Sequence, residues 1–268
     1  MAAALFLTAC QDAPEAEPDA APSTAVASAE TEVPTDEPTA PATAFVDERT
    51  VEDGDAQFIF KYTWPAKASA IPELRPWLDA DRADRYASAK ADWESTVEWC
   101  PDGAVSCLNA ALQKDWKVVT DLPRFLSLSA EVYTYTGGAH GGTVFDAIVW
   151  DRAQGRAVKP IDMFVSNEAV DQATTTAFCN ELDKARQRKR GGPIKRSDAW
   201  SYDCIAPVAS STVILGSSGG ERFDKIGFLI PPYKAGSYAE GAYEVTLPIT
   251  PALMDAVRPE YRRAFIVP

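Results

Sequence analysis

Histidine is almost missing from this chain, because His140 is the only one in 268 residues. A metal site built from several histidines is therefore excluded, and a catalytic site based on histidine has only one position available. Cysteine offers no replacement, since the sequence contains no Cys-x-x-Cys spacing of the kind found in zinc sites. We therefore expect no metal ligands, no cofactor and no catalytic residues, and a protein that binds rather than catalyses.

An excess of basic residues is also absent. The formal net charge is −13. Residues 11–55 hold 13 acidic residues and one basic residue, Arg49, which leaves 26 acidic and 25 basic residues in 56–268. This even balance offers no positive surface to a phosphate backbone, so we expect no nucleic-acid partner. The basic run at 184–190 is interpreted as the end of a helix, where cations complement the carbonyl terminus.

The N-terminus carries a pattern that resembles a bacterial lipobox. Residues 1–10 are apolar and end in Leu7-Thr8-Ala9-Cys10. We expect them to be a lipoprotein signal peptide, with a lipid on Cys10 holding the exported protein to the membrane. Residues 11–55 are rich in Pro, Ala and acidic residues, which predicts a disordered tether. Gln11, rather than aspartate, after the cysteine resembles sorting to the outer membrane, facing the periplasm.

The other cysteines form an even set, which an oxidising compartment would pair. Four cysteines allow three connectivities. Local pairing, Cys100 with Cys107 and Cys179 with Cys204, is favoured because each pair flanks a polar, turn-rich stretch.

Hydrophobic periodicity divides residues 56–268 into strands and helices. Large apolar residues three or four positions apart from Glu73 to Val97 predict a long helix, and Ser166 is a suitable N-cap for a second one ending near Arg190. Strands are predicted at 56–64, 116–119, 125–136, 143–150, 211–215, 225–230, 242–247 and 264–267, with a short helix at 251–257. Two long helices among antiparallel hairpins favour an α+β fold, with an N-terminal part at about 56–135 and a C-terminal part at 136–268.

Two segments carry a family likeness. The first is Tyr135-Thr136-Gly137-Gly138-Ala139-His140-Gly141-Gly142, followed by the turn at 151–155 and by Ile161-Asp162-Met163-Phe164. The second is Pro231-Pro232-Tyr233-Lys234-Ala235-Gly236-Ser237-Tyr238-Ala239-Glu240-Gly241. In this order they resemble the signature of the RsiV-type extracytoplasmic domain, which also forms the N-terminal region of PdaC-type peptidoglycan deacetylases.

The resemblance implies an α+β domain displayed outside the cytoplasm and associated with the cell envelope; the characterised anti-sigma-factor member of this family binds lysozyme. This chain departs from both architectures, since it shows neither a transmembrane helix with a sigma-factor-binding segment nor a deacetylase catalytic domain. The metal motif of such a domain cannot be assembled from one histidine. We therefore expect a lipid-anchored module that binds a lysozyme-like protein or a peptidoglycan-related ligand.

The candidate ligand-binding residues are His140, Gly138, Gly141, Tyr233, Tyr238 and Glu240. Aromatic faces pack on apolar surfaces of sugars or side chains, and a carboxylate orients polar groups. The structural alternative is that His140 fixes its own turn and that the tyrosine segment is a rigid loop packed against it. A competing functional hypothesis is a cell-wall hydrolase that uses His140 and a nearby carboxylate such as Asp146.

Overall fold

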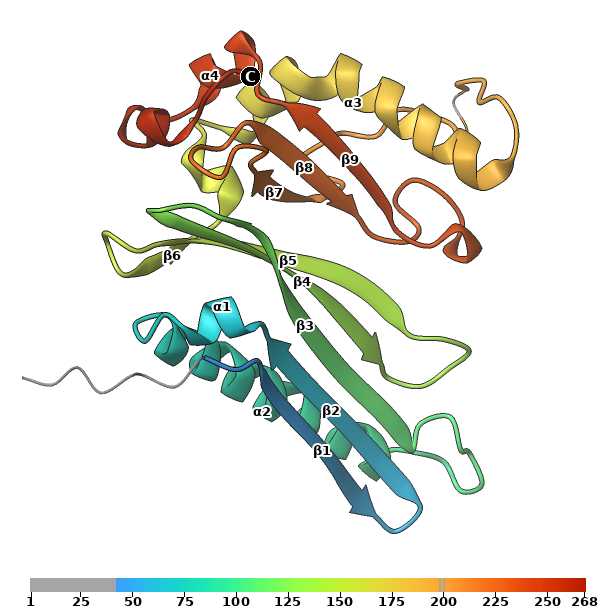
Figure 1. Cartoon of the computed structure of the whole chain (residues 1–268). Coiled ribbons are helices and arrows are strands. Elements are labelled where there is room, and N and C mark those ends of the chain that lie inside the picture. Colours follow the sequence, from blue (N-terminus) through green and yellow to red (C-terminus); the bar gives the residue numbers. More distant parts are fainter. Residues whose placement is uncertain (1–41, 198, 200) are drawn as a thin grey trace, which may run out of the picture. The chain divides into compact units, whose positions relative to one another are not determined.

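The structure, a computed structural model, describes residues 42–268 with the exception of residues 198 and 200. The predicted signal peptide, Cys10 and residues 11–41 of the predicted tether lie outside the described residues. Residues 42–268 form a mixed α+β domain with one six-stranded and one three-stranded sheet, which confirms the predicted fold class. Figure 1 shows the two sheets with helices beside each of them.

The larger sheet has the strand order β1-β2-β3-β4-β5-β6. Its strands are β1 (Phe45–Asp53), β2 (Ala56–Trp64), β3 (Asn109–Asp121), β4 (Phe125–Tyr135), β5 (Gly142–Asp151) and β6 (Arg156–Val158). Neighbouring strands are antiparallel except β2 and β3, which are parallel. A parallel pair needs a crossover connection, and helices α1 (Ala66–Ser69) and α2 (Arg75–Glu98) provide it.

Strand β1 corrects the predicted boundary of the tether, which was placed at residue 55. The strand pairs with β2 along its whole length, and Gly54, with φ of 58°, forms the turn between them. Phe45 stacks on Trp64, with ring centroids 3.6 Å apart. The acidic residues of 47–53, which were assigned to the tether, lie in a strand whose alternate side chains face solvent.

Helix α2 confirms the long helix predicted from Glu73, and it covers one face of the larger sheet. Leu78 and Trp93 are its buried residues. They pack into a core with Phe58 and Phe60 of β2 and Leu128 of β4. This face of the larger sheet and α2 together enclose the core of the N-terminal half of the domain.

The C-terminal half is built around helix α3 (Asn167–Arg190) and the smaller sheet, of order β7-β8-β9. Its strands are β7 (Thr212–Gly216), β8 (Lys225–Ile230) and β9 (Tyr243–Pro248). The remaining elements are α4 (Pro251–Ala256) and the 3-10 helices η1 (Pro160–Met163), η2 (Tyr238–Glu240) and η3 (Pro259–Ala264). As predicted, the Ser166 side chain accepts a hydrogen bond from the Ala169 N–H at the start of α3, and left-handed Gly191 ends it.

The prediction of a strand at 264–267 is wrong. Helix η3 ends at Ala264, and Phe265 makes only an isolated parallel bridge with Phe223. The Phe265 side chain is 2% exposed and packs on the Phe164 and Phe223 rings. Its apolar character therefore reflects burial in the core of the C-terminal half rather than a place in a strand.

Both locally paired disulfides are present, Cys100–Cys107 and Cys179–Cys204. Two disulfides fit an exported protein, because the cytosol keeps thiols reduced. Among the described residues, no helix combines the length and the apolar character needed to span a membrane.

Candidate functional site

The glycine-rich turn joins β4 to β5 and carries His140 at its exposed tip. Gly137 and Gly138 adopt φ of 98° and 84°, a region that side chains with a Cβ rarely occupy. A Cβ on Gly137 would also overlap the Ser106 carbonyl oxygen, and a Cβ on Gly141 would overlap the Tyr133 ring. The predicted ligand-binding glycines, Gly138 and Gly141, thus have architectural roles that explain them.

The loop between β8 and β9 holds Tyr233 in an unusual conformation. Among the described residues it is the only non-glycine residue with positive φ, at 68°. The Tyr233 side chain is nevertheless 56% exposed, so burial of the ring does not offset the cost of this backbone conformation. A large exposed side chain held in an unfavourable conformation is typical of binding loops.

These two loops meet, and their aromatic side chains form a cluster of His140, Tyr233 and Tyr238 that we call the aromatic clasp. The His140 and Tyr238 rings stack with centroids 3.8 Å apart and an interplanar angle of 16°. The Tyr233 and Tyr238 ring centroids are 5.5 Å apart, and the Tyr233 hydroxyl is 3.2 Å from His140 Nε2. The other imidazole nitrogen, Nδ1, lies 2.9 Å from the Gly141 carbonyl oxygen. The clasp thus links a loop of the larger sheet to a loop of the smaller one.

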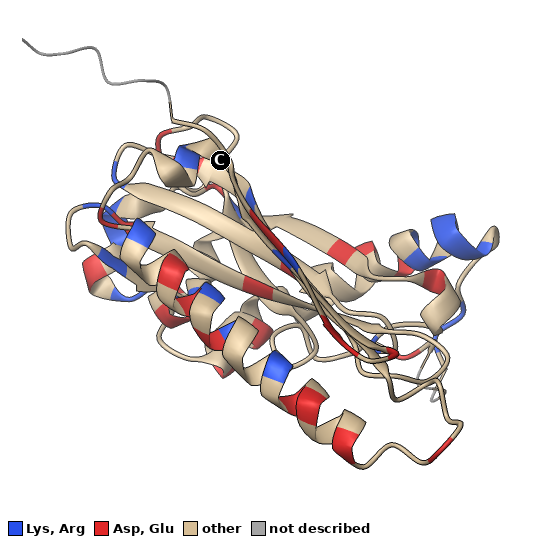
Figure 2. Ribbon diagram, turned by 90° about the horizontal axis from the view of Figure 1, so that it is seen from below, with Lys and Arg blue, Asp and Glu red and all other residues tan. Residues whose placement is uncertain are grey.

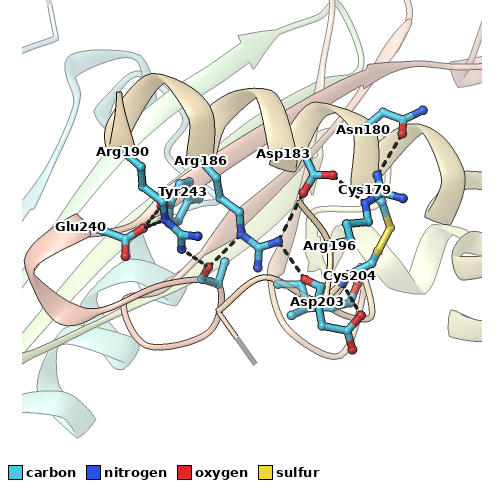
Figure 3. A network of polar contacts seen from close by, with 12 residues as sticks. Cys179, Asn180, Asp183, Arg186, Arg190, Arg196, Asp203, Cys204, Glu240 and Tyr243 are labelled. Atoms are coloured by element: carbon cyan, nitrogen blue, oxygen red, sulfur yellow. Dashed lines mark hydrogen bonds and ion pairs between the residues drawn. A yellow bond between two sulfur atoms is a disulfide. The ribbon is translucent and has the colours of Figure 1, made fainter. Parts of the chain in front are cut away.

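Glu240 does not join the clasp, although the sequence places it among the same candidates. Its carboxylate accepts hydrogen bonds from the Tyr243 hydroxyl and from Arg190 Nε, the latter at 2.9 Å (Figure 3). It also accepts a hydrogen bond from the Ser237 N–H. A Cβ on Gly236 would overlap this carboxylate. Glu240 therefore fixes the β8–β9 loop, which carries Tyr238, to α3.

The ionised Glu240 carboxylate and the neutral Tyr243 hydroxyl stabilise the fold over a wide pH range. Partial burial opposes the charge of Glu240, but hydrogen bonds from Tyr243, Arg190 and Ser237 outweigh it and lower the pKa of the carboxyl from 4.5 to about 2. Burial, together with the Glu240 carboxylate, raises the pKa of Tyr243 from 10.0 to about 12. The Glu240 contribution is therefore present above pH 4.5 and is lost as pH falls towards 2; that of Tyr243 is present below pH 10 and is lost as pH rises towards 12.

The basic run at 184–190 does more than complement the end of a helix. Arg186, which is fully buried, donates from Nε to the Ala235 carbonyl oxygen at 2.9 Å and from Nη1 to that of Asp203 at 2.8 Å. Lys189 donates to the Glu240 carbonyl oxygen at 2.6 Å. Spacings of three and four residues place these cations on one side of α3, which is the signal that the sequence offered for this role.

Asp146, the carboxylate considered for a hydrolase, is paired with other side chains among the described residues. Asp146 contacts Lys114 Nζ at 2.7 Å and Arg85 Nη2 at 2.8 Å, and Glu240 is bound in its own network. The described part of the chain holds no ion pair between His140 and a carboxylate. It also holds no group of three or more His, Cys, Asp or Glu side chains arranged to bind a metal ion.

Comparison with known proteins supports the family likeness over part of the chain. Residues 58–143, from β2 to the glycine-rich turn, match the family model described as "Deacetylase PdaC". The resemblance to a PdaC-type module is thereby confirmed for this region. No curated protein matches the chain.

Two solved structures of the DUF3298 family are similar to most of the chain. The protein from Bacteroides fragilis is 16% identical, with a TM-score of 0.48, and the alignment covers 84% of this chain and 98% of that one. The protein from Pseudomonas aeruginosa is 18% identical, with a TM-score of 0.45, and the alignment covers 82% of this chain and 94% of that one.

Proposed function

We propose that this is a lipid-anchored protein of the cell envelope that uses the aromatic clasp to bind a protein ligand of the lysozyme type. The observation that carries the proposal is the meeting of two loops, 93 residues apart at Tyr233 and His140, in an exposed stacked cluster. Tyrosine is enriched among the residues that dominate protein–protein binding, since its ring contributes area and its hydroxyl a hydrogen bond.

Rigidity of the clasp supports binding over a purely structural role. The network of Glu240 and Arg190 fixes the base of the β8–β9 loop, and positive φ sets the direction of Tyr233. Groups that are ordered before binding lose less conformational entropy when the complex forms. A structural clasp would bury its tyrosines, whereas the Tyr233 ring stays largely exposed.

Substitution of the clasp tests this proposal. Tyr233→Ala and His140→Ala should each weaken the binding of lysozyme about tenfold, because a central aromatic contact contributes roughly 1–2 kcal/mol. The measurement is titration calorimetry with the full chain, and Trp99→Ala, which removes a 79% exposed ring elsewhere, is the matched control. If the native chain fails to bind lysozyme but binds muropeptides through the same residues, the ligand is a cell-wall fragment. Unchanged binding in both clasp variants would refute the role of the clasp.

Lipidation is tested separately. Metabolic labelling with a palmitate analogue should mark the native protein and fail completely for Cys10→Ser, because acylation requires that thiol. Equal labelling of the two forms would contradict the anchor and leave the clasp proposal unaffected.

A further inference from the structure

A cavity whose lining includes charged and aromatic side chains lies beside α2, and it shares no lining residue with the clasp. It has a volume of about 390 Å³ and opens between α2, β3, β5 and the end of β6. Residues Trp77, Asp81 and Arg85, four positions apart on α2, line one wall. Figure 2, which views the domain from the side of α2, shows acidic and basic residues interspersed along the helix.

The floor of this cavity holds a buried charge. Lys114 is 1% exposed, and its Nζ donates to Asp81 Oδ2 at 2.8 Å and to Asp146 Oδ2 at 2.7 Å. The same ammonium lies 4.6 Å from the centre of the Trp116 ring. Arg85 adds a second cation on Asp146 Oδ2 at 2.8 Å. The two carboxylates are thus neutralised by groups of the protein itself.

A third cation gives the lining of the cavity a net positive charge. Lys159 also lines the cavity and is exposed, and the described lining residues thus comprise three cations, Arg85, Lys114 and Lys159, and two carboxylates. An added cation would meet this excess of positive charge, whereas an added anion compensates it. The charges therefore select a ligand with one negative group, and they disfavour amines.

The remaining lining suits a sugar ring. Trp77 is half-buried and meets Trp116 edge to face, with centroids 5.8 Å apart, so part of its indole borders the cavity. Aromatic faces pack on the apolar faces of sugars. The described contacts of Asp146 all use Oδ2, which leaves Oδ1 to accept a hydrogen bond from a sugar hydroxyl. The volume of the cavity falls in the range typical of small-ligand sites.

We infer that this cavity binds an acidic monosaccharide unit, with its ring on Trp77 and its carboxylate between Arg85 and Lys159. The buried Lys114 acts as a positioning residue, since it holds Asp81 and Asp146 apart from the ligand carboxylate. The site is independent of the clasp and stands whether or not the clasp binds a protein.

The test uses the full chain with glucuronic acid as the probe, followed by tryptophan fluorescence and titration calorimetry. Glucuronic acid should bind saturably, while glucose, which lacks the carboxylate, and acetate, which lacks the ring, should each bind at least about tenfold more weakly. Trp77→Ala should weaken binding of the acid about tenfold. Lys159→Ala should reduce the preference for glucuronic acid over glucose.

Matched controls remove other charges and rings. Lys117→Ala deletes an exposed lysine on the opposite face of β3, and Trp99→Ala deletes an exposed indole outside the cavity, so both should bind like the native chain. The inference is overturned if glucuronic acid does not bind, if glucose or acetate binds equally well, or if Lys159→Ala keeps the full preference. Because Lys159 is exposed, that last result is independent of any folding defect in Trp77→Ala.

Discussion

Replacing Lys114 by alanine should lower the free energy of unfolding by about 3–5 kcal/mol, because removal of one member of a buried ion network leaves its partners uncompensated. Lys114 is 1% exposed and bridges Asp81 and Asp146 beneath α2. Asp146 retains Arg85, whereas Asp81 is left with the neutral Tyr62 hydroxyl and a longer contact, 3.6 Å between its Oδ1 and Arg85 Nε. Chemical denaturation of the purified protein measures the loss.

The control for this prediction is Lys117→Ala. The Lys117 side chain is 64% exposed, so its removal should lower the free energy of unfolding by less than about 0.5 kcal/mol. A triple variant, Lys114→Met with Asp81→Asn and Asp146→Asn, should recover most of the stability, since it removes the buried ammonium with both carboxylates and leaves only Arg85, which solvent reaches. A loss below about 1 kcal/mol in Lys114→Ala would show that the carboxylates find water or other partners at no great cost.

The ends of helix α3 were predictable because its signals are local. The Ser166 cap acts on the backbone within one turn, and the helix begins after Ser166 and ends at Arg190, as the pattern predicted. Strand β3 was predicted at 116–119, whereas it extends over Asn109–Asp121. Its first half contains alanine, glutamine, lysine and aspartate, which have weak β propensity, and parallel pairing with β2 overrides that preference.

The candidate site was predictable in its residues but not in its contacts. The sequence singles out His140, Tyr233 and Tyr238, yet stacking across 98 residues between His140 and Tyr238 depends on how the two sheets pack. Glu240 looked equivalent to these residues, and only the position of Arg190 on α3 separates it from them. Lys114 gave no signal of burial, since a lysine within a polar run is normally solvated.

The glycines of the β4–β5 turn should differ sharply when each is replaced by alanine. Gly137→Ala should lower the free energy of unfolding by about 3 kcal/mol, since it combines positive φ with overlap of a backbone oxygen. Gly138→Ala should cost about 1 kcal/mol, because its φ is positive while no atom lies within 4 Å of the added Cβ. Gly142→Ala meets neither obstacle and should be nearly neutral.

This graded series distinguishes architecture from ligand contact. The atom that Gly137 approaches is the Ser106 carbonyl oxygen, next to Cys107 of the first disulfide, so the turn is seated on that loop. If the glycines serve the turn, loss of stability in Gly137→Ala should be accompanied by weaker binding at His140, because the clasp depends on the turn that carries it. Equal, small losses of stability in Gly137→Ala and Gly142→Ala would contradict the close contact between the turn and the disulfide loop. Loss of binding in Gly138→Ala with unchanged stability would instead restore a direct role for that glycine at the ligand.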